Sequence, residues 1–294
     1  MGLNIMCDKN IPDIVFTWAG INNDCTNIRH RYNNELYFSI KSVLKYLSWC
    51  NNIYILVNRD VQIPSKIFDL NNIKIKRINR SDLIENQKYS ITQNSFAVYS
   101  VVDKIPNLNE RFILFDDDFM MLRHTSIEHF FTDNYPIVRL SHRKKKIYKD
   151  DVIIPSGLKR PIYKYNTYSH RPMPCTKEII QKFRCSYPDY NSFVESHINR
   201  FHKCSEDMFM IYYQYALENN MIRRNPSKSD FFQMPHWHSK NKVMFKLEFM
   251  TYLTIFSTLP YKYFNINDDW SKDRRIYNNQ MKIVKKFYIK LYGI

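Results

Sequence analysis

The sequence predicts an α/β fold in which a mostly parallel sheet is covered by helices. Short apolar runs rich in β-branched residues alternate with segments of helical periodicity over roughly the first 120 residues, as βαβ units require. The composition is 44% hydrophobic and 24% charged, which is enough apolar material for a packed core. A chain of 294 residues fits one large α/β domain or a domain with an inserted subdomain.

The first half of the chain supplies the elements of this sheet. Residues 11–18 are apolar and β-branched and are followed by Gly20, which predicts a buried strand that runs into a loop. Residues 33–49 carry apolar side chains at helical spacing, with Lys41 and Lys45 on the other face. On the same reasoning we expect strands at 52–57, 73–78 and 111–115, and a further helix at 95–102.

The second half is predicted to be less regular at first and then helical. Residues 141–166 are basic and interrupted by prolines, which predicts a loop or lid. Residues 249–259 are apolar but shorter than the roughly 18 residues that span a bilayer, so a buried helix or strand is expected. Helical periodicity predicts helices at 177–183, 206–217 and 274–291.

The net charge limits the classes of partner. The formal charge is +16 at pH 7, a field that attracts nucleic acid, acidic membranes or phosphorylated substrates. The basic residues are dispersed, apart from residues 143–146 and a C-terminal stretch around Lys282, Lys285 and Lys286. A non-enzymatic protein that binds polyanions or nucleic acid is therefore one alternative, although no nucleic-acid-binding signature accompanies the charge.

The cysteines and the N-terminus point to a reducing compartment. The six cysteines form no C-x-x-C pair and show no regular spacing, which argues against a zinc ribbon or a disulfide framework. The first residues lack the basic and apolar regions of a signal peptide. We expect a soluble, cytoplasmic protein.

Three adjacent carboxylates are the strongest chemical signal. Asp116, Asp117 and Asp118 directly follow the apolar run at 111–115, so they lie at the carboxyl end of a predicted strand, where α/β sheets bind ligands. Like charges repel one another, and a divalent cation would relieve that repulsion. Either Asp116 and Asp118 or Asp117 and Asp118 would hold the cation, with a diphosphate completing its shell. The alternative is a solvated acidic turn.

Three other polar segments are ambiguous when taken singly. His170 precedes Pro172, which fixes the local backbone and suits either a positioned base or a plain turn. Residues 205–207 have the pattern of a helix N-terminus with acidic residues in its first turn. Residues 265–269 form a polar cluster ahead of the last predicted helix.

In their order along the chain, these segments resemble the Stealth family of hexose-1-phosphoryltransferases, which includes capsule polymerases and the lysosomal-enzyme N-acetylglucosamine-1-phosphotransferase. The resemblance covers most of the chain in four blocks, at residues 13–18, 29–118, 169–172 with 205–208, and 266–268. The sequence departs from the family pattern at several positions. Among them, Tyr99 stands where the family has Glu, Asp116 where it has Asn, and Lys203 where it has Arg.

The resemblance implies a GT-A-like nucleotide-sugar-binding sheet with flanking helices and a helical C-terminal part. It implies a UDP-sugar donor, a divalent cation (Mg²⁺ or Mn²⁺) held by the Asp triplet together with Asp268, and release of UMP. His170 would take the acceptor proton, Lys203 would face the phosphoryl group, and Asp118 would be essential to the chemistry. The residues expected at the nucleotide sugar are Thr17, Trp18, Arg29, Glu35 and Asn94.

The expected organisation is one catalytic unit in three parts. Residues 1–140 form the nucleotide-sugar-binding α/β part, 141–168 the basic loop or lid, and 169–294 a mainly helical part that completes the active site. The expected acceptor is a glycan or polysaccharide, with peripheral membrane contact and without nucleic acid. A metal-dependent GT-A glycosyltransferase that releases UDP is the alternative enzyme.

Overall fold

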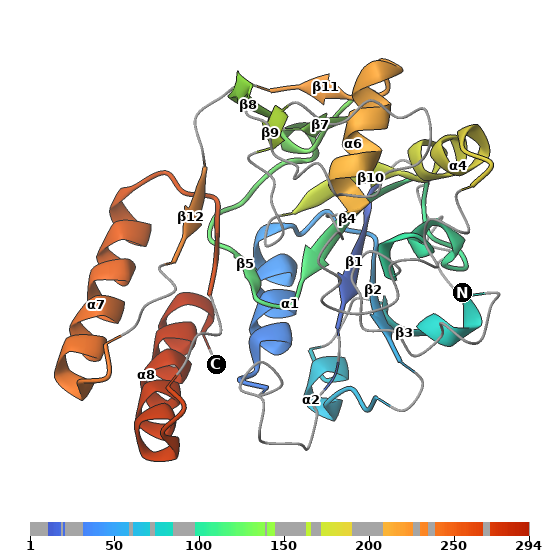
Figure 1. Cartoon of the computed structure of the whole chain (residues 1–294). Helices are drawn as coiled ribbons and strands as arrows, with labels where there is room; N and C mark the ends of the chain where they lie inside the picture. Colours follow the sequence, from blue (N-terminus) through green and yellow to red (C-terminus); the bar gives the residue numbers. More distant parts are fainter. Residues whose placement is uncertain are drawn as a thin grey trace, which may run out of the picture.

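A five-stranded sheet lies at the centre of the molecule (Figure 1). The computed structural model describes residues 11–18, 20, 32–58, 61–70, 74–84, 98–138, 140–144, 163–165, 172–189, 208–225, 230–234, 239–266 and 271–293. The strand order is β10-β4-β1-β2-β3. The parallel strands are β1 (Asp13–Thr17), β2 (Asn52–Val57), β3 (Lys74–Asn79) and β4 (Arg111–Asp116), and β10 (Met173–Thr176) pairs antiparallel to β4.

The two faces of the sheet are covered by different helices because alternate strand residues point to opposite sides. On one face, Ile14, Phe16 and Ile55 pack with apolar residues of α1 (Glu35–Tyr46). On the other face, Val15 and Leu114 pack against α4 (Lys177–Ser186) and α6 (Met208–Glu218). The central strands are therefore apolar on both sides, as in other parallel sheets.

A buried carboxylate ties the amino ends of three strands together. Asp13 is fully buried at the start of β1. Its carboxylate accepts the backbone N–H of Asn52 at 2.9 Å and that of Asn109 at 2.7 Å, and the side-chain amides of Asn51 and Asn52 also donate to it. These charge-assisted bonds hold the amino ends of the strands together, at the end of the sheet opposite to their carboxyl ends.

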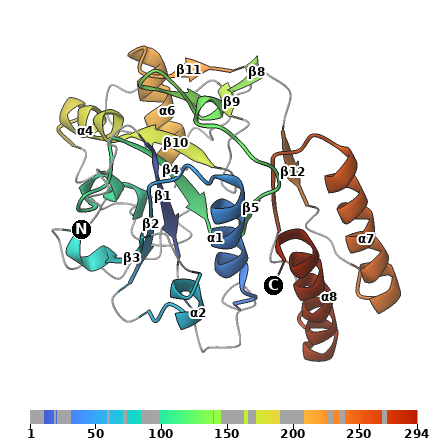
Figure 2. The ribbon, with the colours of Figure 1, turned by 180° about the vertical axis from the view of Figure 1, so that it is seen from behind.

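The C-terminal helices form an outer layer beside α1. α7 (Lys242–Thr258) and α8 (Arg274–Tyr292) pack on a small sheet of β12 (Phe231–Gln233), β13 (Tyr263–Asn265) and β5 (Phe119–Met121). Figures 1 and 2 show α8 between α1 and α7, with α7 outermost. This layer packs through aromatic contacts, among them Phe38 of α1 stacked on Tyr288 of α8 at 4.4 Å between ring centroids.

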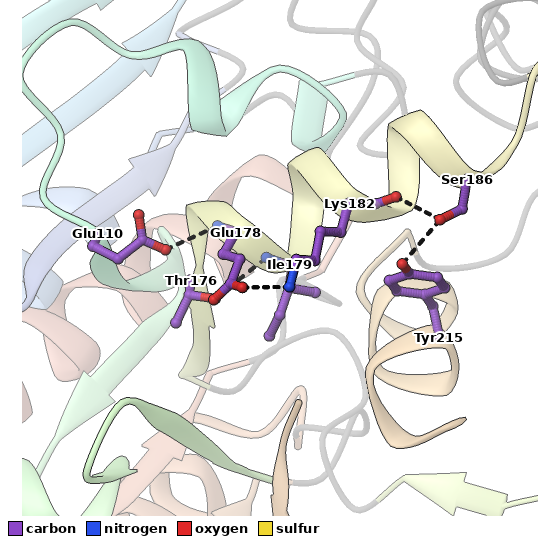
Figure 3. A network of polar contacts seen from close by, with 7 residues as sticks. All are labelled: Glu110, Thr176, Glu178, Ile179, Lys182, Ser186 and Tyr215. Carbon is purple, nitrogen blue, oxygen red and sulfur yellow. Dashed lines mark hydrogen bonds and ion pairs between the residues drawn. The ribbon is translucent and has the colours of Figure 1, made fainter. Parts of the chain in front are cut away.

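Polar contacts hold α4 beneath the sheet and against α6. The side chain of Thr176 accepts the amide of Ile179 and so caps the N-terminus of the helix. The network in Figure 3 also includes Glu110, Glu178, Lys182, Ser186 and Tyr215. Since Glu110 precedes β4 and Tyr215 belongs to α6, the network joins the sheet to both helices on this face.

The remaining elements are short. They are α2 (Ser65–Phe68), the 3₁₀ turns η2 (Arg80–Asp82), η4 (Val102–Lys104) and η5 (Ile127–His129), and the strands β6 (Phe131–Thr132), β7 (Tyr135–Val138), β8 (Leu140–Lys144), β9 (Tyr163–Tyr165) and β11 (Arg223–Arg224).

The α/β class and the helical C-terminal part are confirmed, with three differences. The ends of the predicted loop or lid at 141–166 pair as β8 and β9. β10 adds a strand to the central sheet from the part predicted to be mainly helical. Of the helix expected at 95–102, the structure describes residues 98–102, in which the helix ends at Tyr99 and is followed by a turn and η4. Strands as short as these are difficult to predict from the sequence, because only three to five residues show the alternation of apolar and polar side chains.

Candidate functional site

The carboxyl ends of β1, β2 and β4 meet at one edge of the central sheet. Thr17 is in register with Asp116 across the parallel β1–β4 pair, and the backbone N–H of Trp18 donates to the carbonyl of Leu56 at 3.1 Å. The local sequence produces this edge because apolar strand residues stop at Phe115 and the next three residues are charged. Thr17, Trp18 and the Asp triplet therefore lie together where α/β sheets bind ligands.

Asp116 is positioned by a tyrosine that sequence reasoning had noted only as a departure from the family pattern. The hydroxyl of Tyr99 donates to Oδ1 of Asp116 at 2.8 Å. Here the phenol donates and the carboxylate accepts, so two of the departures form a matched hydrogen-bonding pair.

Asp117 and Asp118 share their surroundings with Glu35. Glu35 begins α1, is 7% exposed, and accepts the backbone N–H of Asn33 at 2.6 Å. Burial raises the pKa of Glu35 to about 7, and the Asp118 carboxylate adds to the shift. Burial also raises the pKa of Asp117 well above its usual value, with further contributions from Asp118, Glu35 and Asp116. Carboxylates crowd one another here, as they do where a cation is bound.

Aromatic side chains border these carboxylates. The ring of Tyr32 lies 5.4 Å from that of Trp18. Burial raises the pKa of the Tyr32 hydroxyl, and Glu35 and Asp117 raise it further. Burial raises the pKa of Tyr288, which α8 contributes, well above its usual value, and Glu35 again adds to the shift. Both phenols therefore stay protonated at neutral pH and can donate hydrogen bonds.

The C-terminal part of the chain closes the site. The backbone N–H of Ile266 donates to the carbonyl of Asp118 at 3.1 Å, and Asn265 pairs with Phe119 across β13 and β5. The hydroxyl of Tyr277 in α8 donates to the side chain of Asn33, just before Glu35. Elements more than 140 residues apart in the sequence thus meet around the Asp triplet.

A positive group lies at the neighbouring strand ends. Arg80 follows β3, is 3% exposed, and donates to the side chain of Asn58 directly after β2. Arg77 donates to the backbone carbonyl of the same residue at 3.3 Å. Sequence reasoning did not single out these residues, although Arg80 stands two residues after the strand predicted at 73–78.

The described residues can provide only some of the ligands of a hard cation such as Mg²⁺. No group of three or more His, Cys, Asp or Glu side chains is arranged to hold a metal ion in the part of the chain that the structure describes. Mg²⁺ is commonly bound by one or two carboxylates together with substrate phosphates and water. Asp117 and Asp118 supply that number of oxygen donors, since Asp116 is engaged by Tyr99.

The expected site residues fall into two sets. Thr17, Trp18, Glu35 and the Asp triplet lie at one edge of the sheet, as described above. The other five, Arg29, Asn94, His170, Lys203 and Asp268, lie outside the described residues. Tyr32, Tyr99 and Tyr288 were not predicted at the site, because their places depend on packing between distant segments.

Comparison with known proteins identifies the region that carries the site. Residues 29–138 match the Stealth protein CR2, conserved region 2. The resemblance to the Stealth family is confirmed over this region, which contains the second of the four blocks. Over 106 residues, 36% of this chain and 28% of the relative, the sequence is 40% identical to the capsular polysaccharide phosphotransferase cps1A of Actinobacillus pleuropneumoniae.

Two further relatives carry similar names. Identity is 35% over 142 residues with the capsular polysaccharide phosphotransferase LcbA of Neisseria meningitidis, covering 42% of this chain and 38% of the relative. It is 31% over 126 residues with the N-acetylglucosamine-1-phosphotransferase subunits alpha/beta of Mus musculus, covering 42% of this chain and 9% of the relative. The matches thus span well under half the length of each of these curated relatives.

Among solved structures, the galactosyltransferase LgtC aligns with a TM-score of 0.49 and 15% identity, over 96% of this chain and 97% of that one. Within the described residues, no helix is both long enough and apolar enough to cross a membrane.

Proposed function

We propose that this chain transfers sugar-1-phosphate from a UDP-sugar to a hydroxyl group of a glycan and releases UMP. The observation that carries the proposal is the grouping of Asp117, Asp118 and Glu35 at the carboxyl end of β4. That grouping falls within the region matched to Stealth conserved region 2, and the relatives that share this region are named as sugar-phosphate transferases.

In the proposed reaction, the acceptor oxygen attacks the phosphorus that carries the sugar. The new bond joins the acceptor oxygen to this phosphorus, the bond to the UMP oxygen breaks, and the hydroxyl proton passes to His170. Lys203 would face the transferring phosphoryl group with its positive charge. Phosphoryl transfer depends on alignment and charge neutralisation more than on covalent help from the protein, so these roles suffice.

The carboxylates fit a divalent cation, Mg²⁺ or Mn²⁺, which when bound would neutralise charge on the diphosphate. Asp117 and Asp118 would hold it, with Asp268 as a further ligand. Ile266 supports the last assignment, because it is hydrogen-bonded to Asp118 and precedes Asp268 by only two residues. On the donor side, Thr17, Trp18, Arg29, Glu35 and Asn94 would bind the nucleotide sugar, in a GT-A-like arrangement.

A metal-dependent glycosyltransferase that releases UDP is the second candidate. The observation that favours it is Asp116, a third carboxylate at the end of β4, which would pair with Asp118 as a ligand if the cation displaced its hydrogen bond from Tyr99. The two reactions break different bonds of the same donor, so their nucleotide products differ.

The test is incubation of the purified chain with a panel of UDP-sugars, glycan acceptors and Mg²⁺ or Mn²⁺, with UMP and UDP quantified separately. We expect UMP as the product, and we expect Asp118→Asn to abolish its formation. Asp69→Asn, at an exposed position after α2, is the matched control and should retain activity. UDP as the only nucleotide product would contradict phosphoryl transfer. Binding of polyanions without any nucleotide-sugar turnover would support the non-enzymatic alternative.

A further inference from the structure

The outer helix α7 presents an apolar face to solvent. Val243 is 66% exposed, Met244 53%, Leu247 54% and Met250 45%. Among the described residues, these are four of the six large hydrophobic side chains with such exposure. A contiguous exposed apolar surface of this kind marks an interaction site more often than scattered single residues do.

The exposed face is not required for packing within the chain. Val243, Leu247 and Met250 are spaced i, i+4, i+7, which places them on one stripe of the helix. The opposite stripe, Phe245, Phe249, Tyr252 and Phe256, is buried against β13 and α8. The helix therefore has an apolar face for the core and a second apolar face that the described part of the chain does not cover.

Basic side chains lie beside this stripe and on the helix next to it. Residues 239–266 and 271–293 contain eleven Lys or Arg but only two acidic residues, Glu248 and Asp273, and ten of the eleven basic residues are exposed. Lys242 and Lys246 lie on α7 itself. Lys290 of α8 approaches Met250, with 3.9 Å between its Nζ and the methionine sulfur. The apolar stripe is thus bordered by positive charge from two helices.

We propose that α7 and its basic surroundings form a docking surface for an anionic lipid bilayer. Helices that lie in the membrane interface combine apolar side chains, which enter the boundary of the acyl chains, with Lys and Arg that contact anionic headgroups. Both components are present on this face. Figures 1 and 2 agree in placing α7 at the outside of the molecule, so a flat surface can reach it.

Other occupants match this surface less well. A second copy would bring two strongly basic faces together, and such like-charge contacts disfavour association. A nucleic acid would satisfy the lysines, but it would not use an aliphatic stripe that lacks exposed aromatic rings for base stacking. A bilayer with anionic headgroups uses the charge and the apolar residues together.

The test is co-flotation of the full chain with vesicles of phosphatidylglycerol and phosphatidylcholine, compared with vesicles of phosphatidylcholine alone. We expect binding to the anionic vesicles. V243S/L247S/M250S and, separately, K242E/K246E should weaken it by about tenfold or more. The variants alter exposed positions only, so unchanged melting temperatures will show that they fold.

Matched controls lie elsewhere on the molecule. F68S changes an exposed apolar residue of α2, and K182E/R224E reverses two exposed charges on α4 and β11. Both should bind vesicles like the wild type. The proposal would be overturned if V243S/L247S/M250S bound vesicles as well as the wild type does. It would also be overturned if the wild type were a dimer and this variant a monomer, or if the wild type bound single-stranded DNA but not vesicles.

Discussion

At the scale of single residues, the contact between Tyr99 and Asp116 shows how a site can tolerate two departures from a family pattern. Tyr99 is 4% exposed, and its hydroxyl is 2.8 Å from Oδ1 of Asp116. The phenol donates to a carboxylate, and such charge-assisted bonds are stronger than bonds between neutral groups. We infer that this bond keeps Asp116 oriented away from the Asp117–Asp118 pair.

Tyr99→Phe tests that inference. Loss of one hydrogen bond should lower the free energy of unfolding by about 1 kcal/mol. Divalent-dependent binding of the donor should also weaken by about tenfold or more, because Asp116 would no longer be held away from Asp117 and Asp118, and the loss of a contact next to metal-binding carboxylates commonly has an effect of that size. Isothermal titration with UDP-sugar and Mg²⁺ measures the second effect.

Tyr54→Phe is the matched control, because the Tyr54 hydroxyl donates to the carbonyl of Asn107, also at 2.8 Å, and Asn107 precedes β4 whereas the triplet lies at the end of that strand. It should show the same loss of stability and unchanged donor binding. If both variants bind the donor equally well, Tyr99 has no role in positioning the site.

The sequence was informative about some of these residues and silent about others. The Asp triplet could be placed at a strand end because the apolar run before it and the charges after it are adjacent in the chain. Glu35 was expected at the nucleotide sugar only through the family resemblance. Tyr288 could not be found, because its place beside Glu35 depends on α8 folding back across some 250 residues of sequence.

At the scale of elements, Arg123 joins α7 to the body of the molecule. Its guanidinium donates to the carbonyls of Leu259 at 2.8 Å and of Phe256 and Tyr261 at 3.2 Å. The last carbonyls of a helix lack partners within the helix, so one side chain here satisfies the end of α7 and the chain that leads into β13.

Arg123→Ala should therefore loosen the outer layer. We expect a loss of about 1–2 kcal/mol in the free energy of unfolding and faster hydrogen exchange at the C-terminal amides of α7. Arg111→Ala serves as the control, because it removes a hydrogen bond to the carbonyl of Asp133 and a cation–π contact with Phe131 but none of the contacts that Arg123 makes with the end of α7. It should leave exchange in α7 unchanged. Equal exchange in the two variants would mean that apolar packing alone holds the helix.

The elements also differ in how well periodicity predicted them. The strand at 52–57 was placed with its observed bounds, and α8 lies within one residue of its prediction, because each has a clear apolar pattern and a defined end. The segment at 249–259 was expected to be buried as a helix or strand. Residues 249–258 form the second part of the longer helix α7, and Leu259 follows its last residue. Only one side of this segment is buried, since Met250 and Leu259 are exposed. Apolar residues on both sides of the helix make the helical period difficult to recognise in the sequence.

At the scale of the whole molecule, β10 determines how the second half of the chain approaches the first. Because β10 runs antiparallel to β4 and Met173 pairs with Leu114, the chain enters β10 at the end of the sheet that carries Asp116. His170 precedes Met173 by three residues. Lys203 precedes α6, in which the hydroxyl of Tyr213 donates to the carbonyl of Pro174 at 2.8 Å. The described chain therefore begins β10 at the end of the sheet that carries the Asp triplet, and the roles proposed for His170 and Lys203 are tested by mutation.

The last prediction separates chemistry from architecture. If His170 takes the acceptor proton, His170→Ala should reduce turnover by roughly 10²–10⁴-fold, while donor affinity and melting temperature stay nearly unchanged. Lys203→Ala should also reduce turnover without unfolding.

The control is His129→Ala, since His129 is held by Asp230 at 3.0 Å and Lys262 at 2.8 Å in a structural network. That variant should lower the melting temperature and leave turnover per folded molecule intact. Should His170→Ala and Lys203→Ala both remain fully active, the proposed phosphoryl transfer would be wrong even though the fold stands.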